Sequence, residues 1–448
     1  MIRKVIFLGF FCMGILFLSA QNDQNQHSMI QQPEWTKNVV IYQVNTRQFS
    51  ASGKFSEVTA QLPRLKDLGV DIVWLMPIHP IGEKNRKGKL GSPYAVRDYK
   101  AVNPELGTLD DLKQLVNTAH SLGMKVILDW VANHTSWDNV WLKDHLDYYT
   151  SDAQGNRPII TLSEDNKTPT DWDDTADLDY SNPKLHTAMI DALQYWLKEA
   201  DIDGFRCDVA CFIPVDFWVQ ARKSLEEIKP VFMLAECDYP YIYQAFNLSY
   251  GWKFYDLMVN IQKGKSSLKD IQTYLDVTNK AFSSNDLIMY FTTNHDKNTW
   301  EGTDKELYDN NADNFAILTY SLGGIPLIYN GQESGLDKRL DFFEHDPIDW
   351  ENYSKTDFYK TLISLYKSNP ALWNGIYRGE IKILEAPEKP GLFIYTVTKN
   401  KNTVTVVQNY SNVPIAVSAD KLPKKLTDKL TNKKLKPVVG RYILPANQ

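Results

Sequence analysis

Cysteine, long apolar runs and basic tracts are all scarce in this chain of 448 residues. Only four cysteines occur, which excludes a small scaffold held together by disulfides. The apolar run at residues 5–18 is short for a membrane span, which needs about 20 residues. No basic tract dominates and the formal net charge is −6, so we expect no nucleic-acid partner. Hydrophobic residues make up 43% of the chain, enough to bury a large core.

The N-terminus has the pattern of a secretory signal peptide. Arg3 and Lys4 precede the apolar run, and small residues at positions 19 and 20 follow it. We therefore expect residues 1–20 to be a signal peptide and the protein to be secreted across the inner membrane. Its destination would be periplasmic or extracellular, and a membrane anchor is the alternative.

Three cysteines follow the expected leader, and an odd number cannot all pair with one another. They are Cys207, Cys211 and Cys237. The histidine pattern of a zinc site is missing beside them. We expect them to be buried, unpaired thiols.

Short apolar runs alternate with helical stretches along most of the chain. Several runs are apolar at successive residues, which is typical of parallel strands buried on both faces. Thr108 can cap a helix over residues 109–122, and Pro183 can begin another that reaches about residue 200. This alternation predicts an α/β fold, a (β/α)8 TIM barrel. Its eight strands would cover residues 39–45, 71–77, 125–130, 203–208, 231–236, 252–257, 287–292 and 325–330.

Two segments depart from this alternation. Residues 134–182 separate the third strand from its helix, and a connection of that length is usually functional or forms a small domain. Short strands with polar turns predict a C-terminal all-β domain, a β-sandwich, over residues 376–448. The barrel would then comprise residues 21–133 and 183–375. We interpret the Lys-rich stretch 421–436 as a solvated face rather than a site for an anionic surface.

Acidic residues stand at the ends of four expected strands. They are Asp129, Asp208 and Glu236, with Asp296 shortly after the seventh strand. Catalytic residues of a TIM barrel lie at these strand ends, and two carboxyls that flank a glycosidic bond can hydrolyse it. Crowding pushes the pKa values of such carboxyls apart, as an acid and a nucleophile require. Each acid could instead cap the following helix, but all of them together with Arg206 favour a glycosidase site.

The residues around these acids resemble the motifs of the α-amylase family, glycoside hydrolase family 13. The resemblance covers residues 39 to about 369 and implies a catalytic barrel. Residues 134–182 would then be the family's domain B, and the C-terminal strands its domain C. The matching segments are residues 92–99 (SPYAVRDY), 129–134 (DWVANH), 204–210 (GFRCDVA), 234–236 (LAE), 291–296 (FTTNHD) and 324–333 (GIPLIYNGQE).

The resemblance implies a retaining mechanism with three catalytic carboxylates. Asp208 would be the nucleophile and Glu236 the general acid and base. Asp296 would hold sugar hydroxyls and favour distortion of the ring. Arg206, which we group with the substrate-binding residues, would keep Asp208 ionised.

Four further residues are implied as substrate-binding groups. His134 and His295 would bond hydroxyls of the sugar that is cleaved, and the ring of Tyr94 would stack on that sugar. Asp98 belongs to this group by its motif, although with Asp129 it better suits the supporting hydrogen-bond scaffold.

Calcium is the one cofactor that the resemblance suggests. In many family members a Ca²⁺ ion joins domain B to the barrel through oxygen ligands. Asn133 and Asp179 match two ligand positions here. The alternative is that both side chains bond to backbone.

The expected substrate is an α-1,4-linked glucan, either a maltooligosaccharide or starch. Cys211 and Phe212 occupy positions where many α-amylases carry Lys and His, and this apolar pair argues against typical endo-cleavage of long starch. The alternatives are an α-glucosidase, an α-1,6-acting, neopullulanase-like enzyme and a transglycosylase. A non-catalytic sugar-binding or scaffold protein is a minor alternative.

Overall fold

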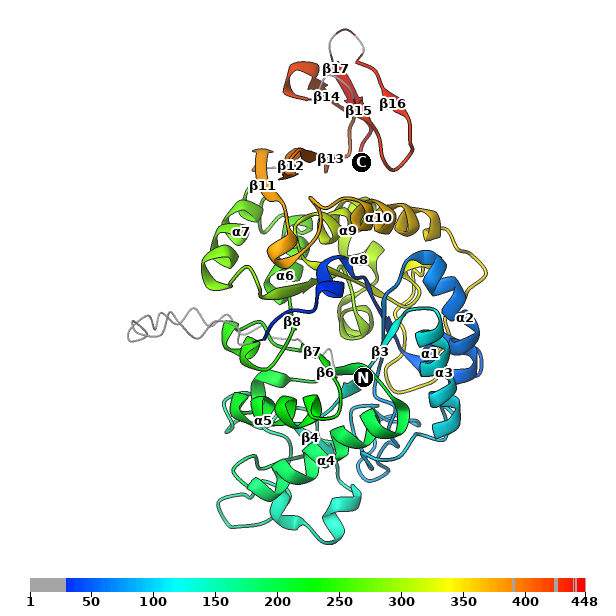
Figure 1. Cartoon of the computed structure of the whole chain (residues 1–448), viewed down its shortest axis with the longest axis vertical. Helices are drawn as coiled ribbons and strands as arrows, with labels where there is room; N and C mark the ends of the chain where they lie inside the picture. The colour runs from blue at the N-terminus through cyan, green and yellow to red at the C-terminus, as the bar shows by residue number, and fades with distance from the viewer. Residues whose placement is uncertain (1–29, 389–390, 423–425, 438, 440, 448) are drawn as a thin grey trace, which may run out of the picture.

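Eight parallel strands close into a barrel in the computed structural model of the chain (Figure 1), which confirms the expected architecture. The structure describes residues 30–388, 391–422, 426–437, 439 and 441–447, so the expected leader lies outside it. Each strand pairs with its neighbour in parallel, and the last pairs with the first. Around the barrel the strands are β1 (Ile41–Val44), β2 (Ile72–Leu75), β3 (Lys125–Trp130), β6 (Gly204–Cys207), β7 (Phe232–Ala235), β8 (Leu248–Tyr250), β9 (Leu287–Tyr290) and β10 (Ile325–Tyr329).

Helices surround the barrel, and local sequence signals mark where several of them begin. Thr108 forms a capping box with Asp111 at the start of α3, and Pro183 stands in the first turn of α4. The helices are α1 (Thr46–Phe49), α2 (Phe55–Leu68), α3 (Leu109–Ser121), α4 (Pro183–Ala200), α5 (Val215–Glu226), α6 (Trp252–Gln262), α7 (Asp270–Ala281), α8 (Asp304–Tyr308), α9 (Ala312–Ser321) and α10 (Thr356–Ser368). Within the described part of the chain, no helix combines the length and the apolar composition that crossing a bilayer requires.

The prediction for the sixth strand was wrong. Residues 252–257 begin helix α6, and the strand is β8, which ends two residues earlier. Helix α6 buries Phe254, Tyr255, Met258 and Val259, a helical spacing. Periodicity in a six-residue apolar window does not separate a buried helix from a buried strand, and β8 itself has only three residues.

The segment between β3 and α4 folds into a small unit, as expected for an inserted domain B. A hairpin-like pair of β4 (His134–Ser136) and β5 (Thr175–Asp177) closes it next to the barrel. Short helical turns η2 (Val140–Lys143) and η3 (Leu146–Tyr148) lie between these strands in sequence. Because β4 begins four residues after β3 ends, this unit stands at the C-terminal edge of the barrel.

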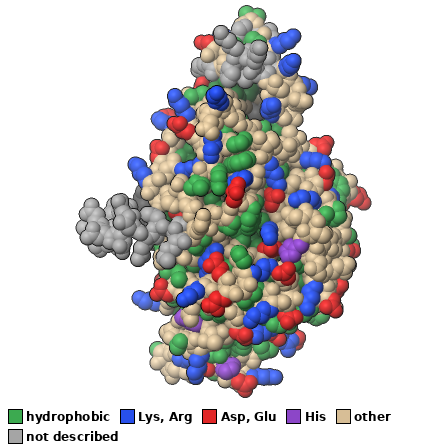
Figure 2. Space-filling view, viewed as in Figure 1, with side chains coloured by type: hydrophobic (Ala, Val, Ile, Leu, Met, Phe, Trp, Pro, Cys, Tyr) green, Lys and Arg blue, Asp and Glu red, His purple; other side chains and the backbone are tan. Residues whose placement is uncertain are grey.

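The C-terminal strands form small antiparallel sheets at the opposite end of the molecule from domain B (orange to red in Figure 1). One sheet contains β11 (Glu380–Glu385), β12 (Leu392–Lys399) and β13 (Asn402–Asn409). β14 (Ile415–Ser418) pairs with β17 (Arg441–Leu444), and β15 (Leu426–Thr427) with β16 (Lys434–Leu435). Part of the Lys-rich stretch falls outside the described residues. On the face in Figure 2, acidic and basic side chains are interspersed.

The cysteine prediction needs a correction, because Cys211 and Cys237 form a disulfide. Their Cα atoms are 5.4 Å apart although 26 residues separate them in sequence. Cys211 follows β6 and Cys237 follows β7, and these two strands are neighbours in the barrel. Cys207, within β6, is the buried free thiol that we expected.

Candidate active site

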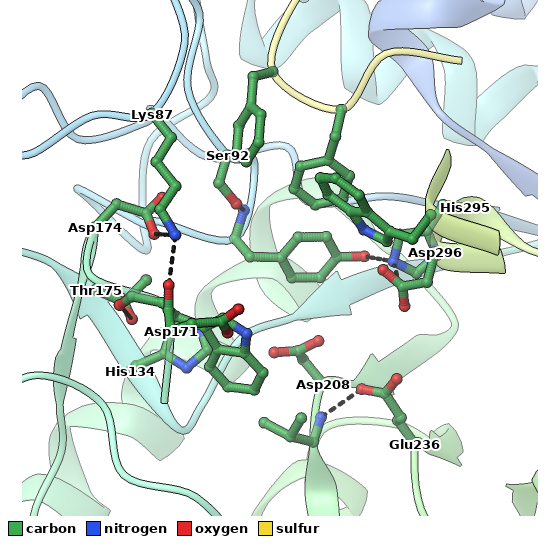
Figure 3. A pocket seen from close by; sticks show the side chains of 16 residues that line it. Lys87, Ser92, His134, Asp171, Asp174, Thr175, Asp208, Glu236, His295 and Asp296 are labelled. Atoms are coloured by element: carbon green, nitrogen blue, oxygen red, sulfur yellow. Dashed lines mark hydrogen bonds and ion pairs between the residues drawn. The ribbon is translucent and has the colours of Figure 1, made fainter. Parts of the chain in front are cut away.

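A cavity of about 440 Å³ opens at the C-terminal ends of the barrel strands. The structure brings six of the predicted site residues together in its lining (Figure 3). Three are the carboxylates Asp208 and Glu236, which follow β6 and β7, and Asp296, which lies beyond β9. The other three are His134, His295 and Tyr94.

A single guanidinium, that of Arg206, lies beneath the carboxylates. Its side chain is completely buried. Nη1 donates to Asp129 at 2.8 Å and to Asp208 at 2.9 Å, and Nη2 forms an ion pair with Glu236 at 2.9 Å. Arg206 lies on β6 and Asp208 directly follows that strand. Because the two residues are two positions apart in extended chain, their side chains point to the same side. Adjacent parallel strands supply the other two acids.

Three carboxylates surround the single Arg206 cation, so the buried cluster carries an excess of negative charge when all three are ionised. Burial raises the pKa of Asp208 well above its usual range, and the guanidinium of Arg206 opposes this. Burial also raises the pKa of Asp129 to about 6, again against Arg206. The cluster around Arg206 therefore binds protons more readily than carboxyls exposed to water do.

Glu236 is oriented by a second contact. Its Oε2 accepts a hydrogen bond from the backbone N–H of Val209 at 2.7 Å, the residue that follows the predicted nucleophile. Val209 has φ 36° and ψ 46°, a left-handed conformation that β-branched residues rarely adopt. The predicted acid is thus bonded to the same loop that carries Asp208.

A chain of hydrogen bonds fixes Tyr94 and His295 at the floor of the cavity. The Tyr94 hydroxyl donates to Asp129 at 3.0 Å and lies 2.7 Å from His295 Nε2. Gln43 Nε2 lies 2.7 Å from His295 Nδ1. If Tyr94 donates to Asp129, His295 donates from Nε2 and accepts at Nδ1 from the Gln43 amide. This assigns the neutral tautomer with the proton on Nε2.

Both histidines of the cavity are neutral at ordinary pH. Burial lowers the pKa of His134 and of His295 to about 3. Arg206 contributes to the lowering at His295. Burial also raises the pKa of Asp296, whose carboxylate lies 3.4 Å from His295. The histidines can therefore exchange hydrogen bonds with hydroxyl groups but do not act as cations.

Aromatic side chains form two walls of the cavity. Trp172 of domain B stacks on Phe212, with ring centroids 6.3 Å apart and an angle of 13°. Phe342 stacks on Tyr94 with an angle of 12°, and Trp300 packs against Phe342. Flat aromatic faces suit the C–H faces of sugar rings.

A loop after β2, residues 82–92, connects the two sides of the cavity, and we call it the bridging segment. On one side Lys87 Nζ donates to the Asp171 carbonyl at 2.7 Å and pairs with Asp173 at 2.9 Å, both in domain B. On the other side the Lys89 N–H donates to Glu344 at 2.8 Å, in the loop after β10. Gly88 packs so closely on Phe343 that a Cβ would lie 2.5 Å from that side chain. The bridging segment thus limits the space on its side of the cavity.

Asp98 is not brought into the cavity lining. Its carboxylate accepts the backbone N–H of Lys100 at 2.9 Å, which is a local turn contact. This position fits neither direct substrate binding nor a bond to the catalytic acids.

The two predicted calcium ligands have other contacts. Asp179 accepts from the backbone N–H of Ser181 at 3.0 Å and from its hydroxyl, and the Asn133 amide lies 3.4 Å from His134 Nδ1. The Asn133 carbonyl accepts from Leu178 at 3.2 Å. Among the residues that the structure describes, no group of three or more His, Cys, Asp or Glu side chains is placed to hold a metal ion. Both residues thus make local hydrogen bonds in the structure, and no step below uses a calcium ion.

Several residues of the site were not found from the sequence. Gln43 on β1, Lys87 on the bridging segment and Trp172 in domain B all contact or line the site from separate segments. Gln43 is a polar residue in an apolar strand, and this was an available signal. Lys87 and Trp172 lie in loops whose positions depend on the fold, and no local pattern marks them.

Two carboxylates lie at the strand ends of the barrel and share one buried arginine. This arrangement matches what glycoside hydrolysis requires. The family model for the alpha amylase catalytic domain matches residues 20–371. The chain therefore belongs to the α-amylase family, and like its relatives it is a hydrolase of O-glycosyl bonds.

Solved structures and curated relatives agree with this membership. An α-amylase from Lactobacillus plantarum is 33% identical with a TM-score of 0.80, covering 91% of this chain and 97% of that one. A maltogenic α-amylase from Thermotoga neapolitana is 31% identical with a TM-score of 0.79, covering 91% and 96%. "Alpha-amylase 2" of Dictyoglomus thermophilum is 25% identical over 83% of this chain and 71% of its own length. Other relatives are named oligo-1,6-glucosidase and maltogenic α-amylase, so the family spans more than one bond specificity.

Proposed function

We propose that this protein hydrolyses α-1,4-glucosidic bonds in maltooligosaccharides or starch-type glucans and retains the anomeric configuration. The observation that carries this proposal is the pairing of Asp208 and Glu236 across neighbouring strand ends on the buried Arg206. The names of the α-amylase relatives support the choice of bond.

In the first step, a carboxylate oxygen of Asp208 attacks the anomeric carbon of the sugar. The glycosidic C–O bond breaks as Glu236 gives its proton to the leaving oxygen, and a covalent glycosyl-enzyme results. In the second step, Glu236 takes a proton from water. The resulting hydroxide oxygen attacks the same carbon and releases Asp208. Two inversions give net retention.

The other residues of the cavity serve the sugar that is cleaved. Asp296, His134 and His295 present acceptors and donors that match sugar hydroxyls. Tyr94 presents its ring to the cavity while Asp129 and His295 hold its hydroxyl. Bonds to hydroxyls that shorten as the ring flattens stabilise the oxocarbenium-like transition state.

We favour short maltooligosaccharides over long starch chains. The bridging segment joins domain B to the loop after β10 and so restricts how many sugar units the cavity can hold on that side. On the domain B side, the lining residue Trp172 presents an aromatic face that Phe212 supports from outside the lining. The restriction by the bridging segment favours products of a few units.

An α-glucosidase or an α-1,6-acting enzyme is the second candidate. The oligo-1,6-glucosidases among the relatives and the restricted cavity favour it. Transfer of the glycosyl group to a second sugar uses the same intermediate. A non-catalytic sugar-binding or scaffold role is the minor alternative, and the complete carboxylate set argues against it.

Product analysis tests these proposals. The purified mature chain is incubated with maltoheptaose, soluble starch, pullulan and isomaltose, and the anomeric form of new ends is followed by NMR. We expect α-anomeric short products from maltoheptaose, and none from the Asp208→Asn variant. Release of glucose one unit at a time, or cleavage only of pullulan or isomaltose, would favour the second candidate. β-anomeric products would refute the retaining mechanism.

We also propose that the protein is exported and works in the periplasm or outside the cell. The leader-like N-terminus supports this, and so does the Cys211–Cys237 disulfide, because such bonds persist in oxidising compartments. Fractionation of the producing cells, with detection of the mature N-terminus by mass spectrometry, tests it. A cytoplasmic protein with an intact N-terminus would contradict it.

A further inference from the structure

The Cys211–Cys237 disulfide joins the two loops that carry the predicted nucleophile and acid. Cys237 directly follows Glu236, and Cys211 stands three residues after Asp208. The sulfur bridge therefore links the ends of the neighbouring strands β6 and β7 directly, and it closes a covalent loop that contains α5 and β7.

The loop after Asp208 has a conformation that its own sequence does not favour. Val209 is β-branched and has a positive φ of 36°, a strained conformation that persists only where the surroundings hold it. The next residues form the short turn η4 (Ala210–Phe212), which includes Cys211. The Ala210 carbonyl accepts from Trp218 Nε1 at 3.0 Å, and Phe212 packs on Trp172. The disulfide is the covalent member of this set of contacts.

The strained residue is also the one that holds the acid. The Val209 N–H donates to Glu236 Oε2 at 2.7 Å (dashed at Glu236 in Figure 3). If η4 moved, this N–H would turn away from the carboxylate. Glu236 would then keep only Arg206 as a close partner within the described contacts of its side chain.

We propose that the Cys211–Cys237 disulfide is a positioning element for catalysis: it holds η4 so that Val209 orients Glu236 relative to Asp208. This inference rests on the proposed hydrolytic function. It makes both cysteines positioning residues, because neither sulfur needs to touch the substrate. It also makes the activity sensitive to reduction of the protein.

A small reductant can reach the disulfide at Cys211. Cys211 is partly exposed, whereas the free thiol Cys207 is fully buried. Burial raises the pKa of Cys207 well above its usual range, so this thiol is unreactive. Dithiothreitol gives two electrons and two protons to the Cys211 and Cys237 sulfurs and becomes a cyclic disulfide itself.

The test compares the oxidised protein, the reduced protein and the double variant Cys211→Ser/Cys237→Ser. Two substrates are used: maltoheptaose, and α-maltotriosyl fluoride, whose leaving fluoride needs less protonation than a sugar does. Their kcat/KM values report steps up to formation of the glycosyl-enzyme. We expect reduction to lower kcat/KM for maltoheptaose about tenfold, since small displacements of reacting groups cost this much or more. The loss should be clearly smaller for the fluoride, and reoxidation should restore activity.

The double variant separates positioning from general stabilisation. Its kcat/KM values should match those of the reduced protein and should not change when dithiothreitol is added. Its circular dichroism spectrum at the assay temperature should match that of the oxidised protein. If the reduced protein stays folded and both substrates keep their full kcat/KM, the proposal is overturned. Equal losses on both substrates would also overturn it, because they would not arise from Glu236. A response of the double variant to dithiothreitol would show that the effect does not come from the Cys211–Cys237 bond, and it would overturn the proposal as well.

Hydrogen exchange tests the same proposal without any turnover. Peptides that cover residues 208–212 and 236–240 should exchange faster in the reduced protein than in the oxidised one, and peptides of α5 should not change. Unchanged exchange in both segments would overturn the proposal. If the oxidised protein turned over no glucan, the proposed function would fail, while this measurement would still decide the role of the disulfide.

Discussion

Replacement of Arg206 by Met should destabilise the fold strongly, and more at neutral than at acidic pH. Methionine has a similar length but leaves Asp129, Asp208 and Glu236 without their shared cation. At an effective dielectric constant of about 20, two unit charges about 4 Å apart interact by roughly 4 kcal/mol. Removal of one partner from a buried ion pair costs about 3–5 kcal/mol in practice. With three carboxylates affected, we expect a loss of about 5 kcal/mol in the free energy of unfolding at pH near 7.

The pH dependence follows from the direction of the pKa shifts. Burial already raises the pKa of Asp129 from 3.8 to about 6 in the presence of Arg206, and the pKa of Asp208 is also raised. A carboxyl with a raised pKa in the folded state adds stability below its unfolded pKa. That stability is lost as pH rises through the folded value. Without the guanidinium the folded pKa values rise further, so the deficit of Arg206→Met relative to the wild type should grow as pH rises through the wild-type folded pKa of Asp129, about 6.

Urea denaturation followed by tryptophan fluorescence measures this deficit at about pH 5 and about pH 7.5. Arg222→Met on α5 is the matched control. Arg222 is also buried and donates to the Ala245 carbonyl and to Asn247, but its acidic partner Glu226 is half exposed. We expect this control to lose about 1–3 kcal/mol, with little change between the two pH values. Equal pH dependence in both variants, or a loss under about 1 kcal/mol in Arg206→Met, would refute the reasoning.

Three further predictions concern the cavity. His134→Gln and His295→Gln should lower kcat but leave the acidic limb of the pH–rate profile in place, because the pKa of each histidine is about 3; a moved limb would contradict this. Trp172→Ala should raise KM for maltoheptaose about tenfold, because one aromatic contact with a sugar ring is lost, and should leave kcat nearly unchanged. An unchanged KM would mean that Trp172 does not contact the substrate. Lys87→Ala should loosen the bridging segment and lengthen the products from soluble starch, as chromatography would show; an unchanged product pattern would mean that this segment does not limit chain length.

The barrel and the acidic residues at its strand ends could be predicted because their signals are local. A buried parallel strand is a short apolar run, and an acid at its end stands in the same few residues. Asp208, Glu236 and Asp296 were found in this way and lie in one cavity. The sixth strand was misplaced because β8 is only three residues long and is followed by a helix as apolar as a strand.

The features that were missed depend on distances between segments. The Cys211–Cys237 bond follows from the adjacency of β6 and β7, and an odd count of cysteines gave no pairing. The bridging segment was missed for the same reason, since Lys87 acts only where domain B meets it. Asp98 shows the converse, because a residue that matches a motif turned out to bond to its own turn. Local sequence pattern therefore predicts site residues at strand ends better than site residues in the surrounding loops.

The excess of negative charge around Arg206 should destabilise the fold, and Asp208→Asn tests this. The variant removes one of three carboxylates from the single guanidinium but keeps an oxygen that can accept from Arg206 Nη1. The substitution removes the repulsion of Asp208 with Glu236 and with Asp129. It also removes a buried carboxyl whose pKa is raised by that burial. We expect hydrolysis to be lost while the free energy of unfolding at neutral pH stays equal or rises by about 1 kcal/mol. A fall of more than about 1 kcal/mol would mean that the Arg206–Asp208 pair stabilises the fold more than the crowding of acids destabilises it.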